Sequence, residues 1–297
     1  MYFAVQIPKY YITLMQETHI IGHQTTNFTD EHLNGWTFVN SGLKVKASAG
    51  VGIALSPNVK LEDVKNILDG RIILIRIILH GIKLSAICAY ATAEEYAEST
   101  KQIFFSTLRK TITNVKQQHP TYKIIIGADM NATIGCDSNG SWPYLGTNND
   151  DLPTNDNGSR LLRLSHECKL FIMNSIYHSK QHHRHTWYSP TGFTKRVDYI
   201  LTEWHIKKLS SNCRVYRRAS IPFKSNHRLL ALTCSFPSKC QQKLFFRKPT
   251  STKKTFTNIK SLKDYQKGLD KFSTTLDGFL QSEPNITDID SFEKSFT

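Results

Sequence analysis

Residues 71–79 constrain the fold of this chain more than any other segment. Their core, Ile72-Ile73-Leu74-Ile75, places apolar side chains at consecutive positions, and in a strand consecutive positions face opposite sides of the sheet. A strand that is apolar on both faces fits a sheet that is covered on both faces. His80-Gly81 separates this run from a second apolar run at 83–90, which predicts a tight hairpin.

The rest of residues 1–236 alternates short apolar runs with loops rich in Gly, Asn, Ser and Pro. Two segments predict helices: Glu94 to about His119, which Pro120 ends, and 158–168. Many strands beside few long helices indicate an α/β sandwich in which β-sheets pack on each other with helices outside. Further strands are predicted at 12–15, 36–39, 52–55, 123–128, 170–173, 185–188, 197–201, 213–216 and 229–236.

Composition narrows the possible functions without deciding between them. The 297 residues are 39% hydrophobic, enough for a sizeable core, and carry a formal net charge of +14. This charge favours a polyanionic partner, although a merely soluble basic protein fits it equally well. The six cysteines form no CxxC pair, which indicates reduced, buried thiols. No signal peptide is recognised, and the apolar run that Arg76 interrupts is too short to span a membrane.

Residues 237–297 differ from the rest and are expected to form a basic linker and tail. Between Lys239 and Lys263 there are eight Lys or Arg and no acid, and a weakly helical segment is predicted at 262–280. We interpret this region as a disordered basic tail, the alternative being an arm that contacts nucleic acid.

Acidic and amide residues follow two of the predicted strands. Glu17 follows the strand at 12–15, and Asp129 and Asn131 follow the strand at 123–128 in Gly127-Ala-Asp-Met-Asn. Alternation along an extended chain places Asp129 and Asn131 on the same side, where an acid that accepts a proton and an amide that orients water suit hydrolysis. The alternative interpretation is an Asx turn that caps its own backbone.

Two further motifs lie later in the chain. Asp198 lies in the run 196–201, which follows Thr186-Trp187, and His227 lies in Ser225-Asn226-His227-Arg228 at the start of the last predicted strand. A lone histidine at a strand start is most often structural. One whose imidazole an aspartate holds in a single orientation is suited to catalysis.

Taken in order, these motifs resemble those of the endonuclease/exonuclease/phosphatase superfamily. The series is Gln-Glu-Thr at 16–18, Tyr-Ala at 90–91, Gly-x-Asp-x-Asn at 127–131, Thr-Trp at 186–187 with Arg-x-Asp-Tyr-Ile-Leu at 196–201, and Ser-x-His-Arg-Leu-Leu at 225–230. Within the superfamily, the stretch Thr-Trp-x-Ser-Pro-x-Gly is similar to the apurinic-endonuclease-like domains of non-LTR retrotransposons and to craniofacial-development-protein-like relatives. The match covers most of 8–236 and implies a four-layer sandwich of two mixed sheets flanked by helices.

The resemblance also implies a role for each matching residue. Glu17 and Asn226 would bind Mg²⁺, with Mn²⁺ as the alternative ion. Asp129 would align or deprotonate the attacking water, with Asn131 orienting the water or the phosphate. Catalysis would further involve His227 on a phosphate oxygen, Asp198 behind it, and Tyr90 at the scissile phosphate. The substrate-binding residues would be Asn226, Arg196 and Trp187.

Two departures from the family pattern affect the expected activity. Family members begin with a strand that ends in an Asn, and this chain starts after it, so we expect a missing first strand and an N-terminally truncated domain at 1–236. Position 226 is Asn where the family has Asp, which removes a negative charge near the metal. Lower metal affinity and reduced activity are therefore expected.

Basic residues gather between Lys169 and Lys224, where eleven Lys or Arg stand against only Asp198 and Glu203. With Trp187, Tyr188 and Trp204 interspersed, this segment predicts a surface for duplex DNA. A solvated basic face is the alternative. Four nearby histidines, at 178, 182, 183 and 185, lack the spacing of a zinc site.

Three functions are therefore compared. The first is a DNA-nicking phosphodiesterase of retrotransposon origin, expected to be intracellular and nuclear, whose tail would once have led into an RNA-directed DNA polymerase region. The second is a nucleic-acid-binding remnant without catalysis, motivated by Asn226 and the missing strand. The third is a superfamily phosphatase acting on a phospholipid or an inositol phosphate. The motif series and the basic surface favour the first.

Overall fold

The computed structural model describes residues 10–29, 34–136, 141–180, 183–216 and 225–235. Its helices and strands all belong to one compact unit, Met1–Phe245. The predicted basic tail at 237–297, with its helical segment at 262–280, lies outside the described residues. No helix in the described ranges has the length and apolar character needed to cross a membrane.

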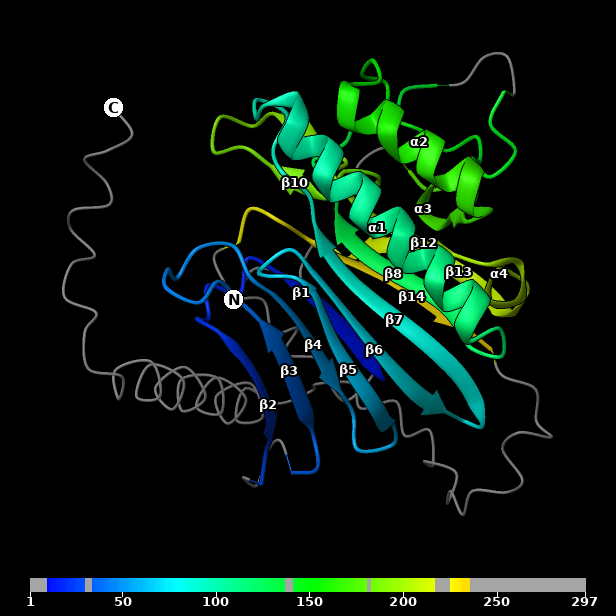
Figure 1. Ribbon diagram of the computed structural model, residues 1–297. Coiled ribbons are helices and arrows are strands. Elements are labelled where there is room, and N and C mark those ends of the chain that lie inside the picture. Colours follow the sequence, from blue (N-terminus) through cyan, green and yellow to red (C-terminus); the bar gives the residue numbers. More distant parts are fainter. Residues whose placement is uncertain (1–9, 30–33, 137–140, 181–182, 217–224, 236–297) are drawn as a thin grey trace, which may run out of the picture. The chain divides into compact units, whose positions relative to one another are not determined.

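Two sheets form the centre of this unit (Figure 1). Their strands, and those of two short two-stranded sheets, are β1 Ile12–Gln16, β2 His23–Asn27, β3 Thr37–Ser41, β4 Val51–Leu55, β5 Lys60–Leu68, β6 Ile72–Leu79, β7 Ile82–Tyr90, β8 Lys123–Asp129, β9 Phe171–Ile172, β10 Trp187–Tyr188, β11 Thr194–Lys195, β12 Asp198–Thr202, β13 Ser210–Tyr216 and β14 Leu229–Cys234.

The two large sheets differ in strand direction. One has the order β1-β4-β3-β2 and is antiparallel throughout. The other has the order β5-β6-β7-β8-β12-β9, in which β7 and β8 run parallel and the remaining neighbours antiparallel. Of the two mixed sheets that the family resemblance implied, only the six-stranded one is mixed.

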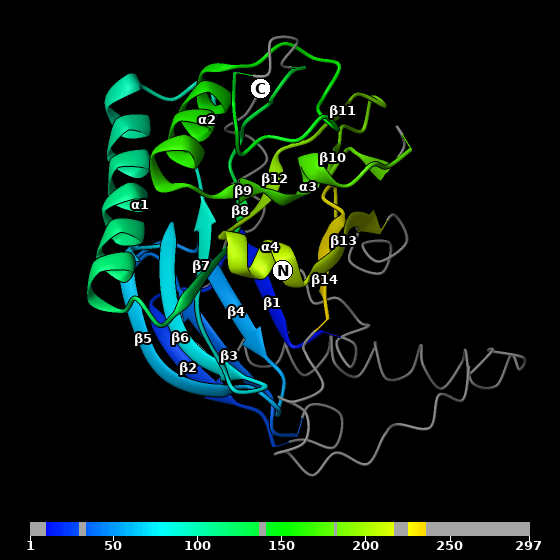
Figure 2. The same ribbon diagram turned by 90° about the vertical axis from the view of Figure 1, so that its right-hand side faces the viewer.

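The long helices, α1 Glu98–Gln118 and α2 Asp156–Cys168, both cover the six-stranded sheet (Figures 1 and 2). Two short helices, α3 Met173–Ile176 and α4 Trp204–Leu209, lie in the connections after β9 and β12. Within the described ranges no helix covers the outer face of the four-stranded sheet. These residues therefore form three layers, helices on sheet on sheet, where four were expected.

Strand β6 carries apolar side chains on both faces of the larger sheet, so both faces must be covered. Alternate side chains of β6 enter two different cores. Ile72 and Leu74 pack beneath the helices, whereas Ile73, Ile75, Ile77 and Leu79 pack between the sheets. The expectation of a strand buried on both faces is confirmed.

The β6–β7 connection also agrees with the sequence. His80 and Gly81 have φ values of 49° and 78°, the left-handed conformations that a two-residue type I′ hairpin turn needs at both central positions. The cysteines within the described ranges are all free, with Cys88, Cys168 and Cys213 buried and Cys136 exposed.

Candidate active site

Three neighbouring strands of the six-stranded sheet place Tyr90, Asp129 and Asp198 in one row. β7 and β8 end at Tyr90 and Asp129, which are paired across the parallel strands. β12 begins at Asp198, which is opposite Asp129 in the antiparallel register. Residues paired in this way point to the same face of a sheet, with Cβ atoms about 4.5–5.5 Å apart. The register alone therefore brings a phenol and two carboxylates together.

Glu17 reaches this row from the four-stranded sheet. It directly follows β1 with a left-handed φ of 54°, and it accepts a hydrogen bond from the Tyr90 hydroxyl. β1 approaches β8 closely because position 127 is glycine: a Cβ there would lie 2.4 Å from Leu14 Cδ1. Gln16 Nε2 donates to the Gly127 carbonyl oxygen at 3.3 Å. The two sheets thus meet directly beneath the site.

A buried network that the sequence analysis missed supports the turn after Glu17. The Thr18 hydroxyl donates to Asn40 Oδ1 at 2.8 Å. Asn40, only 1% exposed, donates through Nδ2 to the carbonyl oxygens of Ile20 at 3.3 Å and Gly22 at 3.1 Å. An amide directly after the apolar pair 38–39 was the available signal for a buried polar role.

His227 completes the cluster, and its predicted pairing with Asp198 is present. Nδ1 of His227 lies 3.1 and 3.3 Å from the two carboxylate oxygens of Asp198, and Nε2 lies 3.9 Å from Asp129 Oδ2. His227 also forms a β-bridge with Trp187. The buried Thr186 hydroxyl accepts the Asp198 N–H at 3.1 Å, so the segment before β10 helps to orient the Asp–His pair.

Asn131 lies beside Asp129 for a different reason from the one predicted. β8 ends at Asp129, and Asn131 has a left-handed φ of 46° rather than an extended conformation. Its N–H donates to Asp129 Oδ1 at 2.9 Å, which is the Asx turn of the alternative interpretation. Its Nδ2 donates to the Ala91 carbonyl oxygen at 3.1 Å. Asn131 therefore forms the Asx turn and also places its side-chain amide near Asp129, so the two interpretations are compatible.

Solved structures with a similar arrangement of elements identify the fold. The endonuclease domain of TRAS1, a telomere-specific non-LTR retrotransposon, superposes with a TM-score of 0.53 and 14% identity over 78% of this chain and 88% of that one. An apurinic endonuclease of Leishmania major gives 0.56 and 11% over 78% and 80%. The APE2 catalytic domain of Xenopus laevis gives 0.54 and 15% over 80% and 88%. The chain has the endonuclease/exonuclease/phosphatase fold.

These likenesses concern the fold, because the identities are low. No protein-family model matches the sequence, and no curated protein matches it. The chemistry of this site must therefore be inferred from its own residues.

Burial and charge shift the protonation of the cluster. Asp129 is 3% exposed, and burial raises the pKa of its carboxyl to about 8, with the charge of Asp198 adding to the rise. Burial would lower the pKa of His227, but the charge of Asp198 and the hydrogen bond to it raise that pKa to about 9. At neutral pH the imidazole is therefore protonated, while Asp129 can take up and release a proton.

One group of side chains could hold a metal ion. Within the described ranges, Asp129, Asp198 and His227 are the one set of three His, Cys, Asp or Glu residues whose ligand atoms lie within 4.8 Å of one another. Glu17, the expected metal ligand, is outside this group but contacts it through Tyr90 and contributes to the charge felt by His227.

The three residues expected to bind substrate occupy different environments. Asn226 is exposed, and Trp187 is half-buried beside His227. Arg196 is 1% exposed, and its guanidinium donates to the carbonyl oxygens of Asn148 at 2.6 Å and Arg184 at 3.2 Å. Because its guanidinium is buried and two of its nitrogens donate to these carbonyls inside the protein, we assign Arg196 a structural role and omit it from the substrate contacts proposed below.

A cavity of about 420 Å³ opens beside the cluster. Glu17, Asp129, Asp198 and His227 are among the residues that line it, and most of the others are apolar residues of β1, β14 and neighbouring elements. Among the described strands, β1 pairs only with β4, and β14 only with β13. Two strand edges without a second neighbour therefore border the cavity.

Proposed function

We propose that this chain is a divalent-metal-dependent phosphodiesterase that nicks duplex DNA, an endonuclease domain derived from a retrotransposon. One observation carries the proposal: side chains from five separate stretches of sequence converge on one cluster. These are Glu17, Tyr90, Asp129, Asp198 and His227. The similarity in fold to nucleases, including a retrotransposon endonuclease domain, supports it.

The donor atoms at this cluster suit Mg²⁺ or Mn²⁺. Both ions prefer oxygen ligands, which Glu17 supplies as a carboxylate and Asp129 supplies once its carboxyl has released its proton. A protonated imidazole has no lone pair to offer, so the raised pKa of His227 makes it a hydrogen-bond donor rather than a ligand. We therefore place the ion on the carboxylate side of the cluster. Bound there, it would polarise a phosphoryl oxygen and stabilise charge on the leaving oxygen.

The remaining groups divide the hydrolysis among them. Asp129 accepts the proton of the attacking water, for which its raised pKa is suited at neutral pH. The Asn131 amide beside it orients the water or the phosphate. The protonated His227, held by Asp198, donates to a non-bridging phosphate oxygen, where charge develops in the transition state. We assign the contact with the scissile phosphate to Tyr90, which is paired with Asp129 on the side opposite Asp198.

A hairpin beside His227 supports DNA as the substrate. Trp187 and Tyr188 form one strand, and Lys195 on the other lies 6.0 Å from the Trp187 ring and 5.3 Å from the Phe193 ring. Phe193, directly before β11, is 48% exposed, and the Arg228 guanidinium stacks 3.3 Å from the Tyr188 ring centroid. Cations interleaved with aromatic rings suit contacts with the phosphate backbone and with bases.

A second candidate, a nucleic-acid-binding domain without catalysis, is favoured by Asn226. An amide next to His227 supplies less negative charge for a cation than the carboxylate it replaces. This candidate predicts salt-sensitive DNA binding that Glu17→Ala leaves unchanged.

The deciding experiment is plasmid nicking by the purified, folded chain with Mg²⁺ or Mn²⁺. The proposal expects supercoiled plasmid to become nicked, EDTA to stop the reaction, and Asp129→Asn to slow it by about 10²–10⁴-fold. If the wild type leaves the plasmid supercoiled and Asn226→Asp restores nothing, the activity claim is wrong. Hydrolysis of inositol phosphates without plasmid nicking would instead favour the phosphatase alternative.

A further inference from the structure

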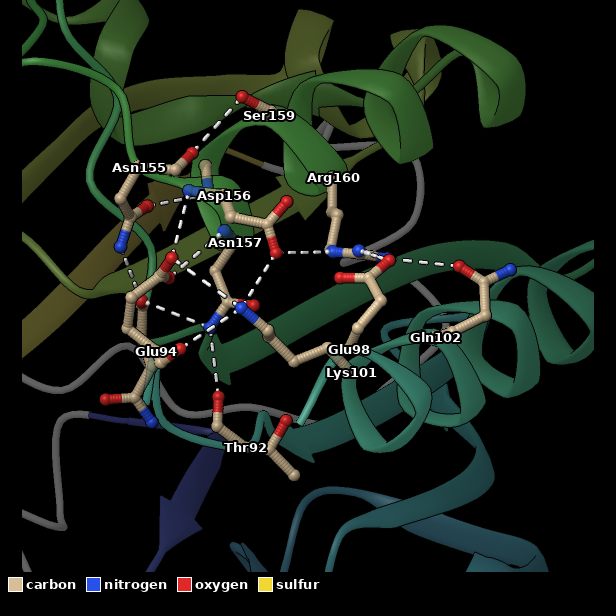
Figure 3. Close-up of polar contacts among 12 residues, drawn as sticks. Thr92, Glu94, Glu98, Lys101, Gln102, Asn155, Asp156, Asn157, Ser159 and Arg160 are labelled. Atoms are coloured by element: carbon tan, nitrogen blue, oxygen red, sulfur yellow. Dashed lines mark hydrogen bonds and ion pairs between the residues drawn. The ribbon is translucent and has the colours of Figure 1, made fainter. Parts of the chain in front are cut away.

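The turn that carries Asn131 is braced by the first turn of α2, whose polar side chains Figure 3 shows. Asn155, the N-cap residue of α2, donates through Nδ2 to the carbonyl oxygen of Asn131 at 3.2 Å. Its Oδ1 accepts the N–H groups of Gly158 at 2.8 Å and Thr133 at 2.9 Å. The Asn155 side chain therefore caps α2 and also binds the backbone of residues 131 and 133, in the segment after Asp129.

Asn157 adds a second brace from the same helix turn. It is fully buried, and its Nδ2 donates to the carbonyl oxygens of Thr92 at 2.9 Å and Asn131 at 3.3 Å. The Thr92 contact links the helix to the segment after β7, where the Ala91 carbonyl accepts from the Asn131 side chain. Asn131 is thus held through its carbonyl oxygen, its amide nitrogen and its side chain.

The other side of the α2 N-terminus is anchored independently (Figure 3). The Glu94 carboxylate accepts the backbone N–H groups of Asp156 at 3.1 Å and Asn157 at 3.2 Å. The Asp156 carboxylate lies 2.8 Å from Lys101 Nζ, and the same oxygen lies 2.9 Å from Arg160 Nε. The helix turn that presents the two bracing amides is therefore itself fixed in place.

This brace holds a conformation that the chain would otherwise avoid. The left-handed backbone of Asn131 is disfavoured for a residue with a side chain, and it persists only where the surroundings hold it. The same conformation aims the Asn131 N–H at Asp129 Oδ1. If the carbonyl of Asn131 were released, the orientation of its amide and of the Asp129 carboxylate would be less defined.

We propose that Asn155 and Asn157 are positioning residues for hydrolysis, which act through Asn131 and Asp129 without touching the substrate. This inference rests on the proposed function, since the positioned groups are those assigned to activate water. Supporting groups of this kind commonly contribute about 10–100-fold to activity.

Asn155→Asp separates positioning from folding. The aspartate keeps an oxygen for the N–H groups of Gly158 and Thr133, and Asp is as good an N-cap as Asn. Only the donor to the Asn131 carbonyl is lost, and a carboxylate oxygen faces that carbonyl instead. We expect kcat for plasmid nicking to fall about 10–100-fold with KM within about twofold, and Tm to change little.

Asp156→Asn is the matched control. It weakens the ion pairs with Lys101 and Arg160 in the same helix turn but leaves both bracing amides and the backbone N–H groups in place. Its Tm should fall while its kcat stays within about twofold of the wild type. Amide hydrogen exchange supplies a readout that needs no activity: the Asn131 N–H should exchange faster in Asn155→Asp and at the wild-type rate in Asp156→Asn.

Each outcome decides the question. An unchanged kcat and unchanged Asn131 exchange in Asn155→Asp overturn the inference, and so does a loss of kcat that follows Tm in both variants. An inactive wild type would refute the proposed function instead, and the exchange rates would still show whether Asn155 holds the turn.

Discussion

Replacing Asp198 by Asn tests whether this carboxylate sets the protonation of His227. The pKa of His227 is raised from 6.5 to about 9 in the folded protein, because the charge of Asp198 and the hydrogen bond to it outweigh the effect of burial. A group whose pKa is raised on folding stabilises the fold fully below its unfolded pKa, and the contribution is lost as the pH rises through its folded pKa. The window is therefore from pH 6.5 to about pH 9.

The size of the effect follows from the shift. A rise of about 2.5 pKa units corresponds to about 3 kcal/mol, and the His227 side chain is only 20% exposed, so solvent screening is limited. The charge of Asp198 also raises the pKa of Asp129, and removing it relieves that repulsion. About 3 kcal/mol is therefore an upper limit for the loss of unfolding free energy in Asp198→Asn at pH 6–7. Near pH 10, where the imidazole is neutral, the variant should equal or exceed the wild type in stability.

The assay is urea unfolding of EDTA-treated protein between pH 6 and pH 10. An NMR titration measures the pKa of the His227 ring, whose signal is assigned by its absence from His227→Gln. Asp69→Asn is the control, because Asp69 forms a more exposed pair with His23 at 3.3 Å and should change stability by less than about 1 kcal/mol. A loss in Asp198→Asn that is the same at every pH would refute the reasoning, and so would a His227 pKa that stays near 9 in that variant.

Three further predictions follow from the packing and the charges. Gly127→Ala should lower the unfolding free energy by about 1–3 kcal/mol, because its Cβ would lie 2.4 Å from Leu14 Cδ1. In the double variant with Leu14→Ala, the loss of unfolding free energy should be smaller than the sum of the two single losses. Strictly additive losses in urea unfolding would contradict the contact. Arg196→Met should cost about 2–3 kcal/mol by leaving the Asn148 carbonyl without its donor, yet leave the salt dependence of DNA binding unchanged. A weaker salt dependence of DNA binding in Arg196→Met would instead show that Arg196 contacts DNA. Asn226→Asp should raise Mg²⁺ or Mn²⁺ affinity about tenfold in calorimetric titration, and an unchanged affinity would place the ion elsewhere.

Apolar patterning predicted the central strands well but missed two of the four edge strands of the large sheets, and it also missed the two-residue strand β11. Runs such as 71–79 and 123–128 correspond to β6 and β8 within a residue, because burial on both faces leaves a continuous apolar signal. β2 and β5 were missed, since each is the last strand of its sheet and carries exposed polar or charged side chains. The strand predicted at 170–173 stops at Ile172 because Met173 begins α3.

The members of the proposed catalytic cluster were predictable from motif order, but the residues that support them were not. Glu17, Asp129 and His227 each stand next to an apolar strand, which is a local signal. Arg196 looked like a surface cation, because no local pattern shows that distant carbonyl oxygens will surround a guanidinium. The same holds for Asn155, whose role as a helix cap is local while its contact with Asn131 spans a connection between separate elements.

The row formed by Tyr90, Asp129 and Asp198 has a consequence for how such a site tolerates change. The spacing of these groups is set by the hydrogen-bond ladder of β7, β8 and β12, so it cannot widen or narrow to suit a substrate. A shift of β8 by a single residue would turn its side chains to the opposite face and separate the carboxylates, although every amino acid would remain present. Insertions and deletions in these strands should therefore abolish function more often than point changes, and adaptation to new substrates is left to the surrounding loops.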